Sequence, residues 1–251
     1  MAVRAHDEDG GIRVLTLDRP PVNAINVELL RDLKTAVDDA ARDHGVRVIL
    51  MRGGERTFSA GLDLKELAAG AGGELARLGR NDGIFALWTV SKPTIAEIGG
   101  HAIAGGAILA LACDFRVTCE GSHRIGLNET SFGIAFPREA LEIARASLPH
   151  EIVMRLILEA ETFEPAEAKE HGFVHEIVAR DQLSDRCMTL ARKLAEYPPA
   201  GYAHNKQYLL DPALAQCGAE TQEARDALTQ LWLSAETMHA VIARVAALSK
   251  K

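Results

Sequence analysis

Two short glycine-containing segments hold the residues best suited to chemistry. The first is Phe58–Lys65, which reads FSAGLDLK, and the second is Gly99–Gly106, which reads GGHAIAGG. Turns built from small residues can leave backbone N–H groups unpaired beside a ligand. Two such groups directed at one point form an oxyanion hole, which stabilises negative charge that develops on an oxygen during a reaction. The pair of segments therefore predicts a catalytic site.

Each segment taken alone also has a structural explanation. Phe58–Lys65 could be an ordinary strand-to-helix turn with a flexible glycine, and Gly99–Gly106 could lead into the start of a buried helix. A dinucleotide site fits poorly, because the second segment does not read G-x-G-x-x-G with a trailing acidic residue in a first βα unit. It is the combination of the two segments that favours function.

The elements around these segments alternate between strand and helix. Strands are expected at 12–17, 46–51, 93–98 and 114–119, where alternating or β-branched apolar residues dominate. Helices are expected at 62–69, 74–89, 105–112 and 27–43, the last with Asn26 as its cap. This alternation is typical of parallel β units with helical crossovers, so the predicted fold class is α/β.

The chain becomes mainly helical after Pro137. Helices are expected at 138–148, 151–160, 165–171, 181–197 and 212–248, with one strand-like segment at 173–178. The last of these helices carries an apolar stripe, and a terminal helix of this kind requires a partner surface. We therefore expect a core at 1–195 and a C-terminal helical oligomerisation region at 196–251.

The bulk composition excludes several classes of protein. The chain has 251 residues, 47% of them apolar, which is enough to bury a large core in one domain with a small helical appendage. The net charge of −7 gives no electrostatic support for nucleic-acid binding. The N-terminal residues Met1–Gly11 are charged and do not resemble a secretory signal, and no apolar run is long enough to span a membrane.

The four cysteines show no metal-binding spacing. They are Cys113, Cys119, Cys187 and Cys217, few for the length of the chain. We expect reduced thiols in a cytoplasmic protein and no metal.

Together the two glycine segments resemble the signature segments of the crotonase superfamily, the enoyl-CoA hydratase/isomerase enzymes, and the resemblance covers nearly the whole chain. It implies a crotonase-like (ClpP/crotonase) spiral of ββα units, followed by a C-terminal helical region that packs between subunits. It further implies an acyl-CoA thioester as substrate and a homotrimer or a homohexamer. No cofactor is implied other than the coenzyme A that the substrate carries.

The resemblance places the oxyanion hole on two backbone N–H groups. One belongs to Leu62, just before Asp63, and the other to Gly105, the middle residue of a triplet that is usually three glycines but here begins with Ala104. The substrate carbonyl must lie against the backbone, where a Cβ would intrude. Removing a proton beside a thioester creates an enolate oxygen, so the two N–H groups stabilise the transition state more than the substrate.

The resemblance also supplies a candidate base. Relatives carry carboxylates at two positions, and here the first is Ile108, which cannot transfer protons, while the second is Glu129. The segment Gly126–Thr130 particularly resembles the Δ3,Δ2-enoyl-CoA isomerases. Where hydratases typically have a glycine whose N–H helps hold the reacting water, this chain has Pro137, which has no N–H.

These residues favour isomerisation of an enoyl-CoA by a single glutamate, because one base can take a proton from C2 and return it to C4. Burial would raise the pKa of Glu129 and make it a better base. One alternative is that Glu129 has no catalytic role and is a solvated loop residue or a cap. The others are an enoyl-CoA hydratase in which Asp82 or Glu139 replaces the missing acid, and an acyl-CoA-binding protein that has lost turnover.

Several further residues are candidates for binding the substrate. Val22, Ala24 and Ile25 are expected along the coenzyme A channel, and Ala60, Ile108 and Pro137 in contact with coenzyme A or substrate. Lys65 is either beside the coenzyme A phosphates or a solvated surface charge. The aromatic residues Phe85, Trp88, Phe132 and Phe136 could wall the acyl pocket, although core packing is the default explanation for such residues. A hydrolytic triad of Ser59, Asp63 and His101 is disfavoured, because nothing in the sequence brings the three together.

Overall fold

The computed structural model describes residues 1–248, apart from the side chains at positions 76, 77 and 248; the last three residues of the predicted 196–251 region lie outside the described residues. The larger sheet is mostly parallel, with one antiparallel pair at its β1 edge. Its strands, in spatial order, are β1 (Val3–Glu8), β2 (Ile12–Leu17), β3 (Val48–Arg52), β5 (Thr94–Ile98), β7 (Phe115–Cys119) and β10 (Glu176–Val178). The predicted α/β class is confirmed.

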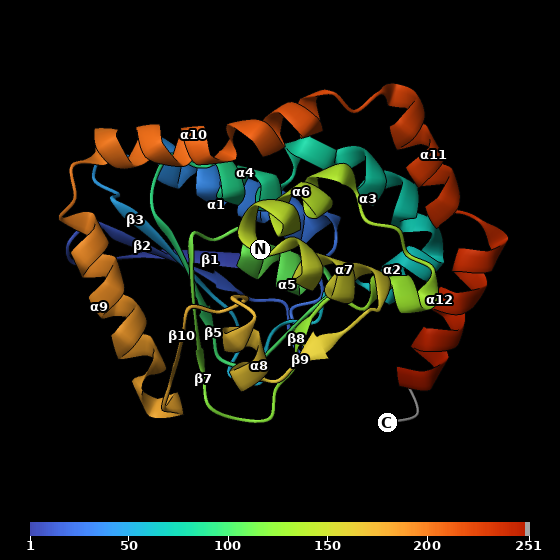
Figure 1. The fold of residues 1–251 in the computed structure, drawn as a ribbon, viewed down its shortest axis with the longest axis horizontal. Helices are drawn as coiled ribbons and strands as arrows, with labels where there is room; N and C mark the ends of the chain where they lie inside the picture. Colours follow the sequence, from blue (N-terminus) through green and yellow to red (C-terminus); the bar gives the residue numbers. More distant parts are fainter. Residues whose placement is uncertain (249–251) are drawn as a thin grey trace.

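Strand β3 illustrates why the sheet lies at the centre of the molecule. Val48 and Leu50 belong to one apolar cluster, and Ile49 and Met51 belong to another. Successive side chains point to opposite faces of a strand, so a continuous apolar run fits a sheet that is covered on both faces. Helix α9 (Leu183–Ala195) covers one face, and most of the other helices lie on the opposite side (Figure 1).

A second, smaller sheet joins the two glycine segments. Its strands, in order, are β4 (Thr57–Ser59), β6 (His101–Ile103), β8 (Ile125–Gly126) and β9 (Thr162–Phe163). The sequence analysis predicted none of these strands. Because β4 and β6 are parallel, their carboxyl ends lie at the same edge, and Phe58–Lys65 and Gly99–Gly106 leave the sheet side by side.

The helices of the first half are interrupted at residues where the sequence analysis predicted no interruption. They are α1 (Val27–Arg42), α2 (Leu64–Glu66), α3 (Gly72–Leu78), α4 (Gly83–Thr89) and α5 (Gly105–Leu111), with a π-turn at Leu67–Ala71 and a 3-10 turn at Gly79–Asn81. Asn26 caps α1 as predicted, since its side chain accepts a 2.9 Å hydrogen bond from the Leu29 N–H. The single helix predicted at 74–89 is wrong: Gly79 has a φ of +44°, and Asp82 begins a new helix by accepting from the Phe85 N–H.

The second half is helical, as expected. Its remaining helices are α6 (Arg138–Ser147), α7 (His150–Leu158), α8 (Pro165–Glu170), α10 (Pro199–Gly218), α11 (Gln222–Trp232) and α12 (Ala235–Leu248), with 3-10 turns at Glu129–Phe132 and Arg180–Gln182. The helix predicted to begin at Pro212 is wrong, because Pro212 lies inside α10. A new helix, α11, begins after Thr221, whose hydroxyl accepts from the Ala224 N–H. None of these helices is long and apolar enough, over the described residues, to cross a membrane.

Candidate active site

The two glycine segments touch each other at Gly61. This residue has a φ of +83°, which favours glycine, and a Cβ here would lie 2.5 Å from the Ala104 Cβ and 3.0 Å from the Gly105 nitrogen. Any side chain at position 61 would therefore push the two turns apart. The glycine makes possible the close approach that the sequence analysis predicted.

That approach brings the backbone N–H groups of Leu62 and Gly105 together. A Cβ on Gly105 would lie 3.7 Å from the Leu62 nitrogen, and it would also meet the Ile25 Cδ1 at 3.3 Å. Neither N–H donates a hydrogen bond to any group of the described chain. Two neighbouring amides without acceptors can both donate to one oxygen of a ligand.

Ala104 adopts a backbone conformation that is strained for an alanine. Its φ is +56° and its ψ is −131°, in a region that residues with a Cβ rarely occupy. The Ala104 N–H donates to the Gly126 carbonyl at 2.8 Å, which fixes the start of α5 against the small sheet. Alanine in place of the usual glycine at position 104 therefore keeps the turn, but the backbone of that residue is strained.

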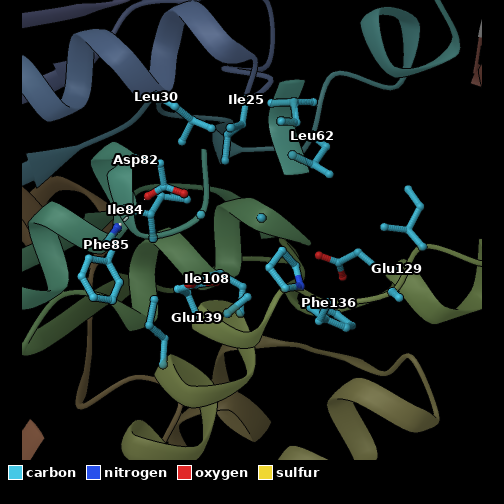
Figure 2. Close-up of a pocket in the computed structure, with 18 of the residues that line it drawn as sticks. Ile25, Leu30, Leu62, Asp82, Ile84, Phe85, Ile108, Glu129, Phe136 and Glu139 are labelled. Carbon is cyan, nitrogen blue, oxygen red and sulfur yellow. Dashed lines mark hydrogen bonds between the residues drawn. The ribbon is translucent and has the colours of Figure 1, made fainter. Parts of the chain in front are cut away.

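A largely apolar cavity lies beside these amides (Figure 2). It brings together Leu62, Gly105, Ile108, Glu129 and Pro137, five of the residues that the sequence analysis selected. Its other lining residues are Ile25, Leu30, Leu75, Gly79, Asp82, Ile84, Phe85, Ile134, Ala135, Phe136, Glu139, Ala140, Ile143 and Trp232. Of the aromatic candidates, Phe85 and Phe136 line this cavity and Trp88 does not.

Glu129 points into the cavity from the 3-10 turn after β8 (Figure 2). Its side chain is buried, and its Oε2 accepts a 3.0 Å hydrogen bond from the Asn128 N–H. Burial raises the pKa of this carboxyl to about 8, although backbone N–H donors oppose the shift. The alternative of a solvated loop residue is therefore wrong, and the group can carry a proton near neutral pH.

Two further carboxyls reach the cavity, on the side away from Glu129 (Figure 2). Asp82 caps α4, and burial raises its pKa to about 6, against the hydrogen bonds from Phe85 and Ile84 and with the help of the Glu139 charge. Glu139 lies in the first turn of α6 and is 6% exposed. Both had been named in the sequence analysis only as replacements for a missing acid.

A second cavity shares Leu62, Glu129 and Ile134 with the first. It is lined by Val22, Ala60, Leu62 and Glu129 among the predicted residues, and also by Phe132. Ala24 and Lys65 line neither cavity, and the Lys65 side chain is exposed at the start of α2. The sequence analysis missed Arg244, which reaches this cavity from α12, because nothing in the sequence places a residue of the last helix beside the first turn.

The residues of the disfavoured triad have structural hydrogen bonds instead. The Ser59 hydroxyl is buried and donates to the Asn23 carbonyl at 2.7 Å. Asp63 caps α2 and pairs with Arg19 at 2.7 Å, while the His101 ring accepts from the Arg124 N–H. Over the described part of the chain, no group of three or more His, Cys, Asp or Glu residues is placed to hold a metal ion.

Comparison with known proteins identifies the family of this chain. A family model described as enoyl-CoA hydratase/isomerase matches residues 7–243. A probable enoyl-CoA hydratase, echA17, of Mycobacterium avium is 34% identical over 76% of this chain and 74% of its own length. The mitochondrial enoyl-CoA delta isomerase 1 of Mus musculus is 32% identical over 75% of this chain and 66% of its own length.

The fold has a close counterpart among solved structures. The human mitochondrial delta3-delta2-enoyl-CoA isomerase matches with a TM-score of 0.92 over 100% of this chain and 99% of its own, at 22% identity. The fold is therefore the crotonase-like one that the sequence predicted. This chain belongs to the enoyl-CoA hydratase/isomerase family.

Proposed function

We propose that this enzyme shifts the double bond of an enoyl-CoA through a thioester enolate. The observation that carries the proposal is the buried Glu129 carboxyl in the same cavity as the free N–H groups of Leu62 and Gly105. Ionised Glu129 takes a proton from C2 of a 3-enoyl-CoA, and the charge moves to the thioester oxygen, where the two N–H groups donate to it. Protonated Glu129 then delivers the proton to C4, and the double bond forms between C2 and C3.

Two residues of the cavity favour isomerisation over hydration. Hydration requires a held water and a second proton-transferring group, whereas isomerisation requires one base. Ile108 is a buried aliphatic residue, and Pro137 has no N–H to donate. The coenzyme A moiety would be part of the substrate, and no further cofactor enters the reaction.

The test is an assay of the purified protein with 3-enoyl-CoA and with 2-enoyl-CoA. We expect the two to interconvert, and we expect Glu129→Gln to lose this activity while still binding a saturated acyl-CoA. Fast hydration of crotonyl-CoA that is undiminished in Glu129→Gln would contradict the one-base mechanism. Binding without turnover on any acyl-CoA would instead identify a non-catalytic binding protein.

A hydratase is the second candidate, because Asp82 and Glu139 supply two more carboxyls to the cavity. One of the relatives is also named as a hydratase. If either carboxyl acts on the water, Asp82→Asn or Glu139→Gln will abolish hydration of crotonyl-CoA. If neither does, hydration will be slow in the parent and unchanged in both variants.

We further propose a cytoplasmic homotrimer or homohexamer, with 196–251 as the oligomerisation region. Four free, buried cysteines suit a reducing compartment. Large apolar side chains are exposed on two helices, Met154 and Leu158 on α7 and Tyr208 and Leu209 on α10, and such surfaces are commonly covered by another subunit. Light scattering on the purified protein tests the number of subunits.

A further inference from the structure

The peptide group that carries the Leu62 N–H is held by Ile25, which lies beside Leu62 at the cavity (Figure 2). The Ile25 N–H donates to the Gly61 carbonyl at 2.7 Å, and the Ile25 carbonyl accepts from the Asp63 N–H at 2.8 Å. The Gly61 carbonyl and the Leu62 N–H belong to one planar trans peptide group, so they point in opposite directions. The bond from Ile25 therefore turns the Leu62 N–H away from the Ile25 main chain and leaves it free for a ligand.

The peptide group between Ala24 and Ile25 is held in the same way, but by a charged side chain. The Ala24 carbonyl accepts a 3.1 Å hydrogen bond from the Nη1 of Arg19. This carbonyl and the Ile25 N–H again share one peptide plane, so Arg19 fixes the direction in which the Ile25 N–H points. A continuous series of hydrogen bonds thus leads from the Arg19 guanidinium, through two peptide groups, to the Leu62 N–H.

The Arg19 guanidinium is itself held on its other side. Its Nη2 donates to the Asp63 Oδ2 at 2.7 Å and to the Glu66 Oε1 at 3.0 Å. The Glu66 Oε1 also accepts from the Asn26 Nδ2 at 2.8 Å, and the side chains of Arg19 and Asp63 are only 26% and 13% exposed. The guanidinium therefore links the backbone just before Ile25 to the residues just after Leu62, in a geometry that a planar fork of donors can satisfy.

A purely structural ion pair explains only part of this arrangement. Asp63 caps α2 through its Oδ1, which accepts from the Lys65 and Glu66 N–H groups, and its Oδ2 remains for Arg19. Helix capping thus needs Asp63, and the ion pair accounts for the Nη2 contacts of Arg19. Neither accounts for the bond from the Arg19 Nη1 to the Ala24 carbonyl, which is the contact that connects the charge to the Leu62 N–H.

A cation at the start of such a series affects the last donor in two ways. It fixes the peptide planes, and it polarises the hydrogen bonds that follow, because each peptide group that accepts a stronger bond becomes a better donor. Both effects matter more for an enolate oxygen, which carries negative charge, than for the neutral carbonyl of the bound substrate. The arrangement is therefore suited to stabilise the transition state rather than to bind the substrate.

We propose that Arg19 is a positioning residue for the oxyanion hole, which orients and polarises the Leu62 N–H through the Ala24–Ile25 and Gly61–Leu62 peptide groups. Arg19 lines neither cavity, so it acts through the backbone and touches no reacting atom. This inference rests on the proposed function in taking the Leu62 N–H as a donor to the thioester oxygen.

The kinetic test compares Arg19→Lys and Arg19→Gln with the parent. Lysine keeps the positive charge beside Asp63 and Glu66 but lacks the second arm of donors that reaches the Ala24 carbonyl. We expect kcat for a 3-enoyl-CoA to fall about tenfold in Arg19→Lys and about 10²-fold in Arg19→Gln, with little change in KM, because misplacing one oxyanion donor acts on the transition state. If Arg19→Lys is as active as the parent, the ion pair is merely structural and the proposal is wrong.

A spectroscopic test does not depend on turnover. Acetoacetyl-CoA is a 3-ketoacyl thioester whose enolate absorbs in the near ultraviolet, so its ionisation can be titrated while it is bound. Glu129→Gln serves as the background, so that the base itself does not titrate. Since a tenfold loss of oxyanion stabilisation corresponds to about one pKa unit, the pKa of the bound probe should rise by about one unit when Arg19→Lys is added. An unchanged pKa of the probe would overturn the proposal, because this variant retains the charge.

Arg186 provides the matched control. It pairs with Glu176 through its Nε at 2.8 Å and its Nη2 at 2.7 Å, and its side chain is 35% exposed, but it lies on α9, remote from both glycine segments. Arg186→Lys and Arg186→Gln should leave both kcat and the pKa of the bound probe unchanged. Circular dichroism melting of all the variants shows whether they fold. Equal losses in the Arg19 and Arg186 variants would show a general effect of removing an ion pair and would contradict the positioning role.

The two tests separate this inference from the proposed function. Enolate stabilisation that depends on Arg19, in a protein that isomerises no 3-enoyl-CoA, would support the positioning role and refute the isomerase. Isomerisation that is unimpaired in Arg19→Lys would do the reverse. If the bound probe ionises no more readily than it does in water, the oxyanion hole is absent and both proposals are wrong.

Discussion

Glu129 is buried in an apolar wall, yet one of its carboxylate oxygens accepts a hydrogen bond from the Asn128 N–H. Burial favours the protonated carboxyl and raises its pKa to about 8, and the N–H donors limit the shift because they stabilise the ionised form. The proposed reaction needs this balance, since the same group must first accept a proton and then return it.

The raised pKa predicts how activity depends on pH. Removal of the C2 proton requires ionised Glu129, so kcat/KM for a 3-enoyl-CoA should rise with pH through about 8 and become constant above it. In Glu129→Gln the rate should fall by about 10²- to 10⁴-fold, and the remaining activity should lose this pH dependence. The pH–rate profiles of the two proteins provide the measurement, and a parent profile that is flat through neutral pH would refute the assignment.

The same shift predicts a dependence of stability on pH. The pKa of Glu129 is higher in the folded protein than the ordinary value of 4.5, so its stabilising contribution is present below 4.5 and is lost as the pH rises through about 8. Glu129→Gln should therefore be more stable than the parent at alkaline pH, by on the order of a few kcal/mol, with the difference disappearing in acid. Urea unfolding at several pH values tests this, and a constant difference would contradict it.

Ala104 offers a prediction about strain. Its φ of +56° and ψ of −131° suit a glycine, and a strained residue of this kind costs about 1–3 kcal/mol. Replacing it by glycine relieves the strain but increases the conformational entropy of the unfolded chain, which offsets part of the gain. Ala104→Gly should therefore raise the free energy of unfolding by about 1 kcal/mol. Denaturant unfolding measures the change, and a loss of stability would show that the Ala104 methyl contributes more by packing than it costs in strain.

At the scale of elements, the start of α5 has two adjacent glycines with different tasks. A Cβ on Gly106 would lie 2.3 Å from the Ser59 carbonyl oxygen, so this glycine allows α5 to pack against β4. A Cβ on Gly105 would meet only the end of the flexible Ile25 side chain closely, at 3.3 Å. Gly106 is therefore required by the fold, whereas Gly105 lines the cavity.

The two glycines therefore form a matched pair of variants. Gly105→Ala should fold normally and reduce kcat by up to about 10²- to 10³-fold, because the methyl group crowds the carbonyl that the two N–H groups must reach. Gly106→Ala should mainly reduce stability, because backbone atoms must move. Circular dichroism melting and kcat, measured for both, separate the effects, and a fully active Gly105→Ala would argue against the oxyanion hole.

The sequence predicted the long elements better than the short ones. The buried strand β3 and helix α1 carry apolar patterns long enough to be read, and the Asn26 cap was correct. Strands β4 and β6 have three residues each, too few to show a period, and they were missed. The break before α4 did have signals, Gly79 and Asp82, but the apolar spacing on both sides of it favoured one continuous helix.

At the scale of the whole molecule, the C-terminal helices complete the site. The Trp232 Nε1 of α11 donates to the Ala135 carbonyl at 2.7 Å, and the Thr237 hydroxyl of α12 donates to the Gly133 carbonyl at 3.1 Å. Both acceptors belong to the segment that follows Glu129. The sequence could supply the two turns and the base through their local motifs, but it could not show that residues of the last two helices lie beside them, because only the folded chain brings them there.

Substitution of Arg244 tests whether the last helix contributes to substrate binding. It is exposed and lines the cavity that Val22 and Ala60 also line, where the sequence predicts the coenzyme A channel. An exposed cation paired with a coenzyme A phosphate binds substrate and transition state equally, so its loss should raise KM and leave kcat unchanged. We expect Arg244→Ala to raise KM by about two- to fivefold at low salt, the range for an exposed ion pair.

The dependence on salt separates this electrostatic role from a packing role. Added salt screens an exposed ion pair, so the difference in KM between the parent and Arg244→Ala should shrink as the ionic strength increases. Arg192→Ala is the matched control, because Arg192 is an exposed arginine on α9, on the other side of the molecule from α12 (Figure 1). If Arg244→Ala instead lowers kcat, or if its effect is independent of salt, then α12 acts by shaping the cavity and Arg244 does not bind the phosphates.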